Sequence, residues 1–588
     1  TLANNAWGSL ARFARLGHPD SLNYLIQAVE EVRDIDPHVI APLVAEIEGL
    51  NLRKTLLSKL NYGGLAYRQR SIRSLFLALE NDRSVRAAVL ARLEDQEEGV
   101  RRAAVYALTG VVATDETIRA AILARLEDQQ WYVRGAAVYA LTDIVATDEM
   151  VRTAILACLE DREMYVRSAA AAALTGVVAT NEMVRTAVLA RLEDQKEDVR
   201  SAALNALASV VATDQAVRTA VLARLEDKEK DVRSAALNSL AGVVATDQTV
   251  RAAVLARLED QEEDVRSAAV YALTGVVDSD ETVRTAVLAR LEDQGDVRRA
   301  AVEALTGVVA TDETVRAAVL ACLEDRKEYV RRAAVEALTG VVATDETVRA
   351  AILARLQDSS WPVRLLTAYC LIPFLSQFSD IRLVLLDWIG TYGYANLWSS
   401  RLREGDKFIE SNLVRKQLSK SFASLLKDDS ALFEAMLSKF DSQEPYARQG
   451  AALTFISMPG GIPSHVLPLL YALLDDGRGE DNQILRIEVA GALLNSREEA
   501  LDRRAIEVLL NALDYATAPW YDERVGQDIQ VEAISLLARL DPVYHDSLLF
   551  DRLRRVLLED RSENVRNAAY KALIGLAATP SKNRTGLT

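Results

Sequence analysis

The chain has 588 residues, of which half are hydrophobic but only 6% aromatic, and its formal net charge at pH 7 is −16. This acidity argues against binding to nucleic acid or to acidic membranes, because both partners need a basic surface on the protein. Three cysteines are too few for a disulfide framework, and there is no apolar run of 18 residues, so we expect a cytoplasmic chain without a transmembrane helix.

Residues 1–81 come first and are expected to form an N-terminal helical cap of divergent repeats. The next segment, residues 82–364, repeats with a period of 33 residues, because Val-Arg pairs recur at that step. The pairs begin at Val100, Val133, Val166, Val199, Val232 and Val265, then after one step of 32 at Val297, and again at Val330 and Val363. A period of this length predicts a solenoid of stacked helical units.

One unit, residues 312–344, illustrates how each repeat is expected to fold. Asp312 is placed to cap a first helix, and Glu313 suits the positive end of that helix. Apolar residues then recur at helical spacing in two runs, and nothing alternates with the period of a strand. The 32-residue unit lacks one residue near Gln294, and a deletion inside a helix would rotate its buried face by about 100°. Residues 96–99 and their equivalents are therefore expected to form a loop.

After residue 364 the units diverge. Residues 365–579 are expected to hold longer and less regular helices of the same kind, and the segment 560–566 restores the repeat motif almost completely. Clusters of Gly and Pro within 459–461 and 476–479 indicate loops. Residues 580–588 are expected to be a disordered tail.

In most units an Asp stands five residues before the Val-Arg pair and two alanines follow it, with one residue between. This pattern resembles HEAT repeats, particularly the short units of phycobilisome-lyase-like proteins. The resemblance implies an all-α fold, a right-handed α-α superhelix. It also implies a ladder of hydrogen bonds along the array between the loop Asp and the Arg of the second helix. The residues that match this ladder include Asp194, Arg200, Asp227, Arg233, Asp260 and Arg266.

The near-identical stretches VRAAVLARLED and AALTGVVATD also resemble the C-terminal repeat arrays of NACHT-type signalling NTPases. The ATPase part of such a protein is not in this chain, because no GxxxxGK[ST] loop is found. The chain begins at Thr1 rather than at Met, which agrees with a fragment of a longer protein.

Residues with catalytic or metal-binding patterns are missing from the sequence. The four histidines form no HExxH, and none is followed by Glu. Cys158 and Cys322 stand where most units have Arg, five repeats apart, and are interpreted as ordinary helix residues. Acidic pairs such as Glu193-Asp194 recur in nearly every unit, whereas catalytic carboxylates would be unique. We therefore expect no enzyme activity, no cofactor and no metal.

Three positions vary most between units, namely those of Gly99, Arg102 and Tyr106. Their spacing of three and then four places them on one face of the second helix, away from the predicted core. We expect this stripe to face solvent on the concave side and to bind a partner, although free drift of exposed residues is the alternative. The predicted contact residues are Tyr106, Trp131, Tyr132, Tyr139, Tyr165, Asn205, Asn238, Tyr271, Arg299, Glu303, Tyr329, Arg332 and Glu336.

The stripe is graded along the chain, from aromatic residues through Asp, Ser and Asn to a mixture of Arg and Glu. Four units have Asp at the first position, which would cap the second helix if it preceded it, whereas others have Tyr or Gly. Such a gradient would suit a directional, extended ligand.

These observations favour a non-catalytic scaffold or ligand-sensing array that binds a protein or peptide. The alternative is a bilin or tetrapyrrole lyase-like or chaperone-like protein, which the resemblance to phycobilisome lyases implies. A third possibility, a plain structural spacer, would not need a patterned stripe. The sequence leaves the oligomeric state and the identity of the partner open.

Overall fold

The computed structural model describes residues 82–389 continuously, together with parts of 57–79 and of 401–578. The expected disordered tail and most of the expected N-terminal cap lie outside the described residues. By the contacts between its residues the chain divides into two compact units, residues 1–308 and 309–588. Each unit is built from pairs of helices, so the predicted all-helical repeat architecture is confirmed.

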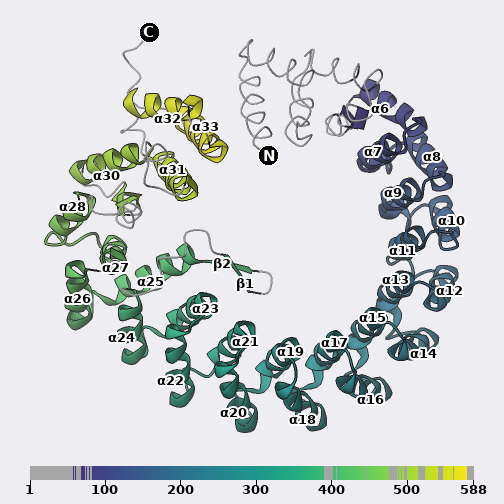
Figure 1. The fold of residues 1–588 in the computed structure, drawn as a ribbon, viewed down its shortest axis with the longest axis horizontal. Coiled ribbons are helices and arrows are strands. Elements are labelled where there is room, and N and C mark those ends of the chain that lie inside the picture. The colour runs from purple at the N-terminus through teal and green to yellow at the C-terminus, as the bar shows by residue number, and fades with distance from the viewer. Residues whose placement is uncertain are drawn as a thin grey trace. The chain divides into compact units, whose positions relative to one another are not determined.

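In the described residues 82–308 of the first unit, every repeat consists of a first helix, A, and a second helix, B. The A helices are α6 (Arg83–Leu90), α8 (Glu116–Ala124), α10 (Glu149–Cys158), α12 (Glu182–Ala190), α14 (Gln215–Ala223), α16 (Gln248–Ala256) and α18 (Glu281–Ala289). The B helices are α7 (Glu98–Leu108), α9 (Trp131–Leu141), α11 (Met164–Ala173), α13 (Glu197–Leu207), α15 (Lys230–Leu240), α17 (Glu263–Leu273) and α19 (Gly295–Leu305). Within this unit the B helices lie along the inner side of the curve and the A helices along the outer side (Figure 1).

The second unit continues the repeats with α20 (Glu313–Ala321), α21 (Glu328–Thr339), α22 (Glu346–Ala354), α23 (Trp361–Leu371) and α24 (Ser379–Trp388). Less regular helices follow, namely α25 (Ser411–Leu425), α26 (Ser430–Leu437), α27 (Pro445–Ile456), α28 (Leu467–Asp475), α30 (Glu499–Ala512), α31 (Glu523–Leu537), α32 (Ser547–Glu559) and α33 (Glu563–Ala578).

One hairpin interrupts the helices of the second unit. Strands β1 (Arg401–Glu404) and β2 (Lys407–Glu410) pair antiparallel, with Arg401 opposite Glu410. The expectation of helices throughout 365–579 was therefore wrong at this point. Only Gly405-Asp406 separates the two strands in the sequence, and a two-residue connection of this type favours a hairpin.

The A helices begin where the sequence places a capping residue. Asp312 accepts hydrogen bonds from the backbone N–H groups of Thr314 and Val315, which confirms the predicted cap of α20. The other A helices within 82–354 are capped in the same way by Asp, except α12, where Asn181 replaces it. Each cap satisfies backbone donors that the first turn of a helix leaves without partners.

The B helices begin two residues earlier than expected. Helix α7 starts at Glu98, so the loop covers only residues 95–97, and Gly99 and its equivalents belong to the first turn. Asp198, at the position of Gly99, is therefore not a cap, because it lies inside α13. The loop is instead closed by Asp95, whose carboxylate accepts the N–H of Glu97 at 3.0 Å. The 32-residue repeat absorbs its deletion in this loop, since α19 keeps the 11 residues of its neighbours.

The core lies between the two helices of a repeat and between neighbouring repeats. Val184 and Val188 of α12 and Val199 and Leu207 of α13 are completely buried. Neighbouring B helices also pack directly against each other, and Ala203 is fully buried between them. Because each repeat buries its apolar face only against its neighbours, the side of each described B helix that faces away from the core remains in contact with solvent.

Candidate partner-binding surface

The stripe positions lie on one side of the B helices, and we call this surface the B-helix face. On α7 to α17 the residues at the third position are exposed, with 52% of Tyr106 and 64% of Tyr139 open to solvent. Asn205, Asn238 and Glu303 are also exposed at this position. The fully buried valines and leucines of the same helices lie elsewhere on the helix. The aromatic residues are therefore not part of the core.

The aromatic segment of the face consists of Tyr106, Trp131, Tyr132, Tyr139 and Tyr165 on α7, α9 and α11. Trp131 stacks on Tyr165 of the next B helix, with 4.8 Å between ring centroids and 24° between ring planes. The rings of Tyr106 and Tyr139 meet edge to face at 6.0 Å. These contacts join neighbouring repeats, yet Trp131 remains 39% exposed and Tyr165 54% exposed. The segment thus consists of two clusters of rings in contact with water, Tyr106 with Tyr139 and Trp131 with Tyr132 and Tyr165.

Tyr132 is the most enclosed member of the aromatic segment. Burial raises the pKa of its hydroxyl, and a hydrogen bond to Glu98 raises this pKa further. The guanidinium of Arg102 lies 5.4 Å from the centre of its ring, which is within the range of a cation–π contact. Tyr132 is therefore held between side chains of the preceding B helix, unlike the open Tyr139.

The middle of the face is acidic. Asp198 and Asp231 are exposed in the first turns of α13 and α15. The carboxylates crowd one another, since the negative charge of Glu229 raises the pKa of Glu197. The second stripe position does not point fully to solvent as expected. The hydroxyls of Ser201 and its equivalents are buried without a hydrogen-bond partner within the described part of the chain.

At the end of the first unit the stripe residues bind one another. The hydroxyl of Tyr271 donates to the carboxylate of Glu303 at 2.8 Å, and Arg299 pairs with that carboxylate at 3.1 Å. Burial and this hydrogen bond raise the pKa of Tyr271 to about 12. In the second unit, Tyr329, Arg332 and Glu336 lie half-buried on α21. The last part of the predicted site is therefore less open than the aromatic segment.

The predicted ladder residues join each repeat to the next. Nε and Nη2 of Arg200 donate to the carboxylate of Asp227 in the following repeat at 2.8 and 2.7 Å. Nη1 donates to the backbone carbonyl of Asp194 in the loop before its own helix at 2.8 Å. The same carboxylate pairing joins Arg101 to Asp128, Arg134 to Asp161, Arg167 to Asp194, Arg233 to Asp260, Arg266 to Asp293 and, in the second unit, Arg331 to Asp358.

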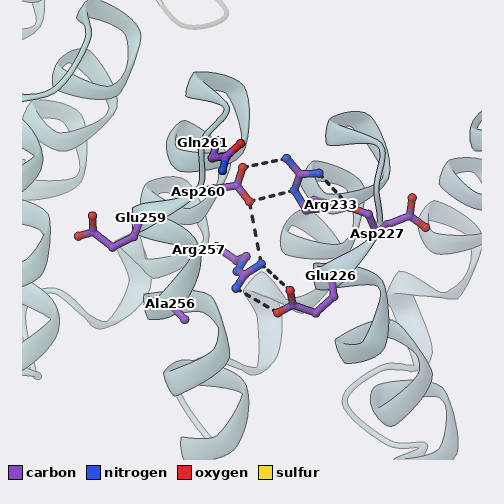
Figure 2. Close-up of a pocket in the computed structure, with 8 residues that line it drawn as sticks. All are labelled: Glu226, Asp227, Arg233, Ala256, Arg257, Glu259, Asp260 and Gln261. Atoms are coloured by element: carbon purple, nitrogen blue, oxygen red, sulfur yellow. Dashed lines mark hydrogen bonds and ion pairs between the residues drawn. The ribbon is translucent and has the colours of Figure 1, made fainter.

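A recess of about 330 Å³ lies beside this ladder, and Figure 2 shows its lining. A second ion pair closes it, in which Arg257 pairs with Glu226 of the preceding repeat at 3.0 Å. Arg233 and Asp260 form the other wall (Figure 2). Because both arginines of the recess are paired with its carboxylates, it is part of the packing between repeats rather than a ligand site.

Cys158 stands at the position of Arg257 in its own repeat and is buried. It removes the second ion pair at that junction, because Glu127 then lacks the arginine that Glu226 has. Burial raises the pKa of the Cys158 thiol to about 12, so this thiol is not activated as a nucleophile.

Residues that could hold a metal do not come together in the described part of the chain, where no group of three or more His, Cys, Asp or Glu side chains is suitably placed. Nor does any helix among the described residues have the length and apolar character needed to cross a membrane.

Comparison with known proteins identifies the repeats. The family model described as HEAT repeats matches residues 86–175, 119–208, 152–241, 185–274, 219–306 and 283–372. No curated protein sequence matches the chain. Among solved structures, yeast importin-beta (Kap95p) is similar in fold at 12% identity, with a TM-score of 0.50 over 95% of this chain and 89% of that one. Kap121p bound to Pho4p matches at 13% identity and a TM-score of 0.41, over 97% and 80% of the two chains.

Proposed function

Because residues 86–372 are an array of HEAT repeats, we propose that this chain is a non-catalytic scaffold that binds a protein or peptide on its B-helix face. The observation that carries the proposal is the aromatic segment. Four of its five side chains are at least 39% exposed, and ring contacts join them in two pairs across neighbouring helices, Tyr106 with Tyr139 and Trp131 with Tyr165. The low cysteine content supports an action in the cytoplasm.

The physical argument rests on the free energy of exposing aromatic rings to water. Each ring has about 150–250 Å² of surface that would be buried in a contact. Single exposed apolar residues are common, but a contiguous patch marks an interaction site. Tyr and Trp are also the residues that most often carry the binding energy of an interface. Other repeats place Ala or Asn at the position of Tyr139, so the fold itself does not require a ring there.

The tetrapyrrole alternative receives no support from the recess beside the ladder. A macrocycle of this kind needs apolar walls with a few polar anchors. Six of the eight residues that line the recess are charged, and both of its arginines pair with carboxylates of the recess (Figure 2).

The test compares two matched pairs of substitutions in the full chain. Tyr139→Ser/Tyr165→Ser removes exposed rings from the B-helix face. Met150→Ser/Met183→Ser removes side chains that are 71% and 63% exposed on the A helices α10 and α12. The methionine variant should keep the unfolding free energy of the wild type to within about 1 kcal/mol, because exposed positions contribute little. The tyrosine variant also removes two ring contacts, each of which contributes about 0.5–1.5 kcal/mol, so it should lose no more than about 3 kcal/mol.

Pull-downs with wild type and both variants, read by quantitative mass spectrometry, then measure partner binding. We expect at least one partner that the methionine variant retains and the tyrosine variant loses. If both variants capture the same proteins in the same amounts as wild type, the aromatic segment is not the binding surface. Circular dichroism of each variant excludes unfolding as the cause.

A further inference from the structure

The aromatic segment adjoins the acidic part of the same face. Helix α11, which carries Tyr165, packs directly against α13, and α13 packs against α15 (Figure 1). The residues 196–198, 229–231 and 262–264 at the starts of α13, α15 and α17 contribute seven carboxylates and two lysines. Aromatic rings and carboxylates therefore follow one another on a single surface of the first unit.

Most of these carboxylates are not neutralised. Asp198 and Asp231 are exposed, and within residues 82–389 no cation lies within ion-pair distance of either. Lys230 neutralises only Asp264, at 2.5 Å. Lys228 pairs with Glu229 at 3.5 Å, and the other five of the seven carboxylates have no ion pair among the described residues. A partner that lies on the aromatic rings and extends along the array therefore meets uncompensated negative charge.

We propose that the B-helix face of the first unit binds an extended peptide that places an apolar or aromatic residue on the aromatic segment and lysine or arginine residues over α13 and α15. This inference rests on the proposed function, since it names the class of partner. Charge complementarity selects a basic peptide, and contact of apolar groups with Trp131 and Tyr139 supplies the anchor.

The repeat spacing predicts how the peptide's basic residues are arranged. Neighbouring helices pack about 10 Å apart. A peptide in the extended polyproline II conformation advances about 3.1 Å per residue and has about three residues per turn, so every third side chain points to the same side. Each step to the next B helix therefore takes roughly three peptide residues. Lysines at every third position meet Asp198 and then Asp231, whereas consecutive lysines do not.

Other occupants of the face agree less well with its charge. A second copy of this chain would present the same B-helix face, whose acidic part holds seven carboxylates and two lysines, so it supplies few cations to neutralise Asp198 and Asp231. Nucleic acid would bring phosphates to the same carboxylates. A basic peptide is the partner that relieves the repulsion.

The test uses labelled synthetic peptides of about 12 residues, long enough to span four B helices when extended. The first peptide has one Phe followed by Lys at every third position in a Gly/Ser background. In three matched peptides, Glu replaces Lys, Ser replaces Phe, or the same lysines stand together. Fluorescence anisotropy with the full chain measures each dissociation constant.

We expect the spaced-lysine peptide to bind at least tenfold more tightly than the glutamate, serine or clustered-lysine peptides. Its affinity should fall at least tenfold for Asp198→Asn/Asp231→Asn, and also for Tyr139→Ser/Tyr165→Ser, and should decrease as salt is raised. Asp296→Asn is the control, because it removes an exposed carboxylate at the far end of the same face, where Arg299 pairs with it at 3.8 Å, and it should leave the affinity unchanged.

The proposal is overturned if the lysine and glutamate peptides bind equally, or if the aspartate variant binds the lysine peptide as wild type does. Either result leaves the scaffold function standing when the pull-down still shows partners that depend on Tyr139 and Tyr165. If those partners are missing as well, the scaffold proposal fails together with it. Circular dichroism confirms that each variant is folded before titration.

Discussion

Replacing Arg200 with alanine should break one junction between repeats. Arg200 and Asp227 are both buried, with only 6% and 7% of their side chains exposed. Without the arginine, the carboxylate of Asp227 keeps the N–H of Glu229 at 3.1 Å, but loses both guanidinium bonds. The carbonyl of Asp194 loses its donor as well. Removing one partner of a buried pair costs about 3–5 kcal/mol, so we expect a loss of this size.

The loss should be local, because each repeat of a solenoid is stabilised by its own folding and by its two neighbours. Urea unfolding of the full chain, followed by circular dichroism, measures the total effect. Amide hydrogen exchange measured by mass spectrometry locates the effect. Relative to wild type, the increase in the exchange rate should be larger in α13 and α15 than in α7 and α9. A second substitution, Asp227→Asn, removes the unpaired charge and should recover part of the loss in a double-mutant cycle.

The matched control is Arg218→Ala on α14. Its pair with Asp247 is longer, at 3.5 Å, and more open, with side-chain exposures of 17% and 26%. Such a pair contributes less than about 1 kcal/mol. Equal effects of the two substitutions on the unfolding midpoint, or unchanged exchange in α13 and α15 after Arg200→Ala, would refute the assignment of a stabilising role to the ladder.

Three further predictions concern charge and the thiol. Burial alone would raise the pKa of Asp260, but hydrogen bonds from Arg233 and from the Glu262 N–H outweigh burial and lower this pKa. The ionised Asp260 therefore stabilises the fold above about pH 4, and this contribution is lost as the pH falls through the lowered pKa. An unfolding midpoint that stays constant during acidification would contradict this. Asn181→Asp should give Arg152 the carboxylate partner that the equivalent arginines of neighbouring repeats have, and it should raise the unfolding free energy by about 0.2–1 kcal/mol. A lower urea midpoint would contradict this prediction. Cys158, buried and with its pKa raised to about 12, should react with iodoacetamide at least tenfold more slowly in the folded than in the urea-unfolded chain, and similar rates would show that its junction is open.

Much of the fold could be predicted from the sequence because the near-identical repeats can be compared with one another. The 33-residue period predicts the helix pairs, and Asp312 predicts where an A helix begins. The single deletion near Gln294 indicates the loop, since only a loop tolerates a change in length. The start of the B helices was placed two residues too late, because Glu97 precedes α7 without a capping hydrogen bond from its side chain, unlike the Asp that caps each neighbouring A helix.

The partners within the ladder could not be resolved from the sequence. Asp194 and Asp227 occupy the same position in successive repeats, so the pattern cannot tell which of them Arg200 contacts. The answer depends on how closely the repeats pack, and the structure shows that the guanidinium binds the carbonyl of one and the carboxylate of the other. The pairing of Tyr271 with Glu303 was missed for the same reason, because it crosses from one repeat to the next.

The ladder has a consequence for how such a chain changes its length. Each Arg-Asp bond joins residues 27 positions apart, and the same two positions recur in the next repeat. Removing or duplicating one complete unit of 33 residues therefore brings an identical Asp to every Arg. Misaligned recombination between near-identical coding stretches would add or delete whole repeats without leaving a charge unpaired. The array can be lengthened or shortened in steps of one repeat, whereas an insertion of a few residues within a helix would break it.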